Sequence, residues 1–131
     1  MAVDVDRRVV TEGALWTLAV ALPPVWLVSV LESDDLPGEE SNLWLLTPVA
    51  LLAGFAIGGF TAARRRRDTP LLHAAVAAAC AFGAVALFGL VRRVLGDDDV
   101  TVSYVVRLLL LAQICVSTAL LGGWVAARRA Q

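Results

Sequence analysis

The sequence predicts an all-α, polytopic membrane protein: a four-transmembrane-helix bundle in a single domain, residues 1–131, with the N-terminus and the C-terminus cytoplasmic. Three observations carry this prediction. Hydrophobic residues make up 59% of the chain, whereas a soluble domain has about 45–50% apolar residues. Four long stretches of the chain contain no charged residue. Most arginines lie before the first stretch, between the second and the third, and after the fourth.

The gaps free of Asp, Glu, Lys and Arg set the expected helices. They cover residues 13–31, 43–63, 69–91 and 108–127. Crossing the hydrocarbon core of a bilayer takes roughly 20 apolar residues, and each gap has about that length. Four core helices this long would leave a small soluble protein almost no polar surface. We therefore expect transmembrane helices over residues 13–31, 43–63, 70–92 and 100–127.

The arginines indicate how these helices are oriented. Cytoplasmic loops of membrane proteins retain Arg and Lys. With the N-terminus inside, most arginines fall in the inner segments, whereas the outer loops hold only Arg92 and Arg93. Both termini are therefore expected inside. The inner set comprises Arg7, Arg8, Arg64, Arg65, Arg66, Arg67, Arg128 and Arg129.

The first helix is expected to carry a kink. Pro23 and Pro24 stand in its middle, and each proline lacks an N–H and crowds the carbonyl four residues back. Broken helices expose carbonyls that coordinate ions in transporters, but many membrane helices carry Pro as a simple kink, which we favour here. A signal peptide cleaved after Ala19-Val20-Ala21 is the alternative; it would leave an apolar core shorter than the usual 7–15 residues or so.

One short phrase occurs twice, as GGFTAARR over residues 58–65 and GGWVAARR over residues 122–129. Both copies are expected at the cytoplasmic ends of helices, where Arg stops translocation. In both helices small residues recur four positions apart, a pattern that lets helix backbones approach closely in a membrane. The expected helix-packing residues are Gly54, Gly58 and Ala62 in the second helix, and Thr118, Gly122 and Ala126 in the fourth.

Two origins of the repeated phrase stay open. A tandem duplication would relate two hairpins by an axis along the membrane normal. The first and third helices do not match at the same offset, however, since His73 aligns with Val9 and Leu87 with Pro23. Independent origin requires only that the topology demands Arg at both places.

The third helix is expected to begin with Thr69 as its cap and Pro70 at its first position. His73, the one histidine of the chain, follows about one turn later. Histidine side chains titrate near neutrality, so a proton relay or pH sensor is one interpretation. A hydrogen-bonded packing residue is the other interpretation, and we favour it for a single histidine near a helix end.

Arg107 is the one charge inside the fourth apolar stretch when that stretch is counted from Val100. Charges inside a membrane are costly and often functional, which suggests an anion site or a gating ion pair. Residues 108–127 span the membrane without it, so we favour an anchor whose side chain extends to the outer interface. Cys80 and Cys115 are expected to be apolar packing residues.

Arg64, Arg65, Arg66 and Arg67 form an uninterrupted basic run. Its first role is to stop translocation. It could also bind anionic lipid head groups, at about 1 kcal/mol per Arg near the surface. The run is too short, and too close to the membrane, to indicate nucleic-acid binding.

Residues 58–65, followed by Leu72 and His73, resemble a pattern in small uncharacterised bacterial four-helix membrane proteins. Members of that family end helix two with Gly-Gly-aromatic-x-Ala-x-Arg, which residues 58–64 match. A His-Gly pair opens their helix three, where this chain has His73 and Ala74. The resemblance implies a prokaryotic membrane protein with no established activity and no known cofactor.

The leading functional hypothesis is a structural or accessory subunit, because small-residue stripes abound and polar groups inside the apolar stretches are few. The alternative is a small oligomeric transporter or channel, motivated by the repeated phrase, the two prolines and Arg107. The sequence has no catalytic constellation, metal-ligand spacing or phosphate loop, so neither an enzyme nor a cofactor is expected. The expected partners are membrane lipid and either further copies of the chain or a larger membrane protein.

Overall fold

A computed structural model describes residues 5–33, 45–66, 68–96 and 99–129 of the chain. Within these ranges the secondary structure is helical, without strands. Each helix is long and apolar enough to cross a membrane, which confirms the predicted all-α class and the four apolar helices. The helices are α1 (Arg7–Ser33), α2 (Leu46–Arg65), α3 (Pro70–Leu95) and α4 (Val102–Arg128).

The helix boundaries differ from the predicted ones mainly at the start of α1. This helix begins at Arg7 rather than at residue 13, so that its first turns lie outside the apolar stretch. It is one helix through Pro23 and Pro24. α3 begins at Pro70 as predicted, because a proline needs no hydrogen-bond acceptor in the first turn.

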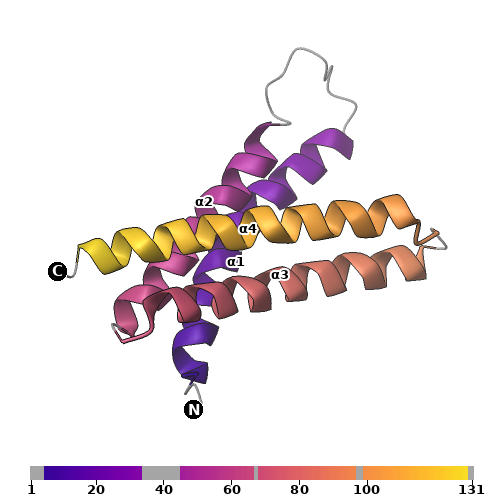
Figure 1. The fold of residues 1–131 in the computed structure, drawn as a ribbon. Helices are drawn as coiled ribbons and strands as arrows, with labels where there is room; N and C mark the ends of the chain where they lie inside the picture. Colours follow the sequence, from indigo (N-terminus) through magenta and orange to yellow (C-terminus); the bar gives the residue numbers. More distant parts are fainter. Residues whose placement is uncertain (1–4, 34–44, 67, 97–98, 130–131) are drawn as a thin grey trace.

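The helices form two hairpins that cross each other. α1 lies beside α2, and α3 lies beside α4 (Figure 1). α2 contacts all three other helices, and α1 also contacts α3. Beyond the crossing, the far end of the α1–α2 hairpin diverges from the far end of the α3–α4 hairpin (Figure 1). α2 is therefore the central helix of the molecule.

The core sits where the hairpins cross. Its members are mostly alanines and glycines, and the largest fully buried side chains are Phe55, His73 and Thr17. In the described part of residues 82–114 no residue is buried. Where the hairpins diverge, a cavity of about 200 Å³ opens between α2, α3 and α4. Apolar side chains dominate its lining, among them Leu51, Phe55, Phe82, Leu108 and Leu111.

The seam between α1 and α2 is built on Gly54 and Gly58. A Cβ atom at Gly58 would collide with the Thr17 hydroxyl and lie 2.6 Å from the carbonyl oxygen of Gly13. A Cβ atom at Gly54 would lie 2.9 Å from the carbonyl oxygen of Thr17. The Thr17 hydroxyl donates to the carbonyl of Gly13 at 3.0 Å, so this buried polar group is satisfied within its own helix. The absence of side chains on α2 thus lets the two backbones touch.

The seam between α2 and α4 uses different glycines. A Cβ atom at Gly59 would collide with the backbone of Ala119, and one at Gly122 would collide with the backbone of Ala56. Each helix therefore presents one glycine to one alanine of the other. Gly123 turns toward α3, where an added Cβ atom would lie 2.9 Å from the Cβ atom of Ala74.

The two halves of each Gly-Gly pair thus serve two different neighbours. Successive residues of an α-helix point about 100° apart. Gly58 faces α1 and Gly59 faces α4, while Gly122 faces α2 and Gly123 faces α3. A double glycine at this level lets one helix approach two others closely. This explains why the phrase GG is useful in both α2 and α4.

Candidate functional site at the basic end of the bundle

Polar side chains gather at one end of the bundle, which we call the basic end. The start of α1, the end of α2, the start of α3 and the end of α4 meet there. Asp6 contacts both Arg66 and His73, and the guanidinium of Arg129 lies 5.9 Å from the ring centre of Phe60 on α2. The described arginines of this end are Arg7, Arg8, Arg64, Arg65, Arg66, Arg128 and Arg129; Arg67 lies outside the described residues.

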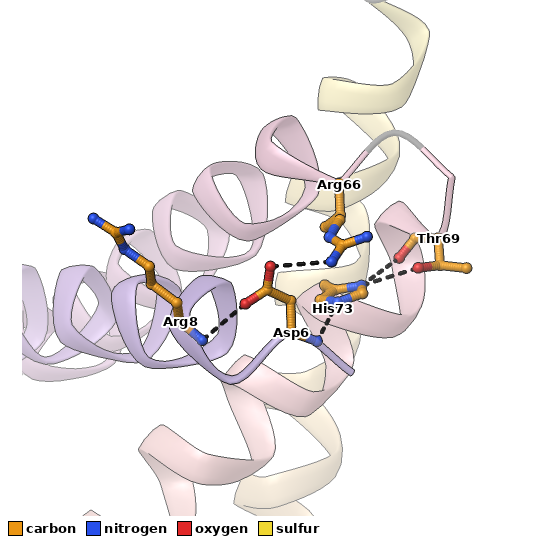
Figure 2. A network of polar contacts seen from close by, with 5 residues as sticks. All are labelled: Asp6, Arg8, Arg66, Thr69 and His73. Carbon is orange, nitrogen blue, oxygen red and sulfur yellow. Dashed lines mark hydrogen bonds and ion pairs between the residues drawn. The ribbon is translucent and has the colours of Figure 1, made fainter. Parts of the chain in front are cut away.

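His73 is fully buried in the first turn of α3, and both ring nitrogens have partners (Figure 2). Its Nε2 atom accepts the backbone N–H of Asp6 at 3.2 Å. Because a backbone N–H can only donate, the neutral ring must carry its proton on Nδ1. Nδ1 lies 3.0 Å from the carbonyl oxygen of Thr69 and 3.1 Å from its hydroxyl oxygen. The surroundings therefore fix one neutral tautomer.

Asp6 joins α1 to the link between α2 and α3 (Figure 2). Its Oδ1 atom accepts the N–H of Arg8 at 3.0 Å, which caps the start of α1. Its Oδ2 atom accepts from Nη2 of Arg66 at 3.1 Å. The hydrogen bond from Arg66 lowers the pKa of the Asp6 carboxyl, and the N–H groups of Arg8 and Val9 lower it further, while desolvation opposes them.

This network acts as a clamp on the N-terminal segment. Asp6 contributes its backbone N–H to His73 and its carboxylate to Arg66, so one residue holds three elements together. Arg66 can reach the Asp6 carboxylate because α2 ends one residue before it and the backbone of Arg66 is extended. Thr69 is the N-cap residue of α3 as predicted, but its side chain makes no capping hydrogen bond and its hydroxyl lies beside the His73 ring instead.

A groove lies next to the clamp, between α1 and α2. Its volume is about 530 Å³. Glu12 forms an ion pair with Arg65 at its polar end, and the guanidinium of Arg64 lies 5.6 Å from the ring centre of Phe60. Trp16 and Ile57 supply apolar walls. The groove therefore offers both cationic and apolar surface to a ligand.

The remaining residues singled out in the sequence lie apart from the basic end. Arg107 is exposed in the second turn of α4. Cys115 is buried in α4 and Cys80 is exposed on α3, and both are free thiols. Thr118 is half-buried, with its hydroxyl donating to the carbonyl of Ile114 at 2.8 Å. The packing residues Gly54, Gly58, Ala62 and Ala126 are buried, and Gly122 is half-buried.

Sequence reasoning missed Asp6. An Asp directly before a helix is a capping signal, and this signal could have drawn attention to it. Nothing in the linear sequence indicates that Arg66, sixty positions later, contacts the same carboxylate. Among the described residues, no group of three His, Cys, Asp or Glu side chains is placed to hold a metal ion. No family model, curated protein or solved structure matches the chain.

Proposed function

We propose that this chain is a structural or accessory subunit of a prokaryotic cytoplasmic membrane, with both termini in the cytoplasm. The observation that carries the proposal is the glycine crossing of the two hairpins. At Gly59 and Gly122 the backbones of α2 and α4 are in contact, so the crossing leaves no space for a solute between these helices. A fixed crossing of two apolar hairpins suits a scaffold that other membrane helices pack against.

The charge distribution supports the orientation. The N-terminal segment, the end of α2 and the end of α4 meet at the basic end, and Arg92 and Arg93 lie at the other end of α3. Arginine-rich ends are retained in the cytoplasm. Both termini and the link after α2 are therefore assigned to the cytoplasmic side.

The test is the composition of the protein complex in native membranes. The tagged chain is extracted with a mild detergent, and mass spectrometry measures the molar ratio of every copurifying protein. An accessory subunit recovers one membrane protein in near-stoichiometric amount. Recovery of the chain alone, as an oligomer of defined size, contradicts the proposal and favours the transporter or channel. Flux across liposomes that contain the purified chain would then be the next measurement.

A further inference from the structure

The groove between α1 and α2 is amphipathic along the helix axis. On α2, Arg64, Phe60 and Ile57 follow one another about a turn apart, from the basic end inward. On α1, Glu12 lies nearer the basic end than Trp16, one turn away. At about 1.5 Å per residue, charge at Arg64 gives way to apolar surface at Ile57 within about 10 Å. A molecule that fits this groove has a polar end and an apolar end.

The cations around the groove differ in how they are neutralised. Arg65 pairs with Glu12, and Arg66 pairs with Asp6. Within the described part of the chain, Arg64 forms no ion pair, and its side chain is exposed beside Phe60. The guanidinium of Arg129 approaches the same Phe60 ring from α4. Two guanidinium groups thus lie near one aromatic ring, and of these two arginines Arg64 is the one that lines the groove.

We infer that this groove binds one anionic phospholipid. Arg64 holds the phosphate group, and the part of an acyl chain next to the head group lies against Trp16 and Ile57. Guanidinium groups are suited to phosphate because they donate several N–H bonds from one plane. Trp is enriched where a ring meets both acyl chains and head groups. The inference does not depend on the accessory role, since a carrier or a channel with this groove would bind the same lipid.

A free anion is a poorer match than a lipid. Inorganic phosphate would use the guanidinium groups alone and leave the apolar wall of Trp16 and Ile57 without a role. A zwitterionic lipid would use the wall but bring a second, positive charge toward Arg64. An anionic head group on an acyl chain uses both parts of the groove.

The experiment measures lipid binding to the purified full chain in detergent micelles by native mass spectrometry. The probes are palmitoyl-oleoyl phosphatidylglycerol, phosphatidylcholine with the same chains, and inorganic phosphate. We expect phosphatidylglycerol to bind more tightly than phosphatidylcholine, and Arg64→Gln to weaken it about fivefold. Arg128→Gln is the matched control: it removes one positive charge at the same end, and the Arg128 guanidinium lies 4.0 Å from the ring centre of Trp124 on α4, outside the groove. This control should bind like the unchanged chain.

Three results would overturn the inference. Equal losses in Arg64→Gln and Arg128→Gln would mean diffuse attraction to the basic end. Equal binding of the two lipids would mean that no anion is recognised. Displacement of phosphatidylglycerol by inorganic phosphate would mean a free-anion site. Trp16→Ala provides a second variant if Arg64→Gln does not fold: Trp16 is 50% exposed, and its loss should weaken lipid binding, while unchanged binding would contradict the role of the wall.

Discussion

At the scale of single residues, the clamp at the basic end shows how one buried histidine determines local structure. His73 must accept from Asp6 and therefore must donate through Nδ1 toward Thr69. The other neutral tautomer, with its proton on Nε2, would leave the N–H of Asp6 without an acceptor. The charged groups that surround the ring in the clamp are the Asp6 carboxylate and the Arg66 guanidinium.

The acceptor at His73 can be tested by paired substitutions. His73→Leu removes the acceptor and leaves the Asp6 N–H without its partner, so we expect a loss of about 1 kcal/mol in the free energy of unfolding. His73→Gln carries a side-chain oxygen that can replace Nε2, and it should recover part of this loss. Denaturant titration of the purified chain in micelles, followed by circular dichroism, measures both. Equal stabilities for the two variants would show that the acceptor contributes nothing.

The carboxylate of Asp6 predicts a separate dependence on pH. Its pKa is lowered in the folded chain, chiefly by Arg66, from an ordinary value of 3.8. A lowered pKa means that the stabilisation is present above the unfolded value and is lost as the pH falls toward the folded value. Asp6→Asn keeps a capping side chain but removes the charge. The unchanged chain should therefore unfold at a higher temperature than Asp6→Asn at pH 7.

The same comparison at about pH 3, which is below the ordinary pKa of an aspartate side chain, provides the control. The difference in unfolding temperature between the two proteins should shrink there, because Asp6 takes up a proton in the unfolded chain and its lowered pKa in the folded chain then contributes less stability. A difference of the same size at both pH values would mean that the ion pair with Arg66 is not its source.

At the scale of helices, the seams depend on which face each glycine occupies. Gly59 meets the backbone of Ala119, which cannot move away independently of α4. Gly83, in the middle of α3, has nothing within 4 Å of the position of an added Cβ atom. These two glycines form a matched pair, because both lie inside helices and only one lies at a seam.

Gly59→Ala should destabilise the protein by about 1–3 kcal/mol, since overpacking forces the backbones apart. Gly83→Ala should be neutral, or stabilising by up to about 1 kcal/mol, because Ala favours the helix over Gly. Unfolding of both variants by titration with a denaturing detergent, with circular dichroism as the signal, measures the difference. If the two substitutions had the same effect, close packing at Gly59 would not be what holds α2 to α4.

The helices themselves could be predicted from the sequence, but their neighbours could not. Gaps without charge are a one-dimensional signal of length and polarity, and they located all four helices. They placed the start of α1 too late, because a capped helix can extend into water before its apolar stretch begins. The spacing of Gly54 and Gly58 predicts a close contact between two helices, but only the structure shows that the second helix is α1. The partner of a seam depends on helix crossing, which no local pattern encodes.

At the scale of the whole molecule, the two hairpins are held together at one level only. Buried residues occur in α3 only up to Ala81 and in α4 only from Cys115 onward. Beyond that level the hairpins diverge and expose apolar faces (Figure 1). The clamp and the glycine crossing therefore share one half of the molecule, and the arginines of the basic end lie at the end of this half.

The orientation of this half is the prediction that concerns the molecule as a whole. Reporter fusions at the C-terminus and after Arg67 should both behave as cytoplasmic: a fluorescent protein should fluoresce there, and alkaline phosphatase should stay inactive. A phosphatase inserted between residues 34 and 44, in the link after α1, should be active and serves as the control. The expected pattern follows from retention of arginine-rich segments inside. Active phosphatase at the C-terminus would place the basic end outside and would reverse the orientation of every helix.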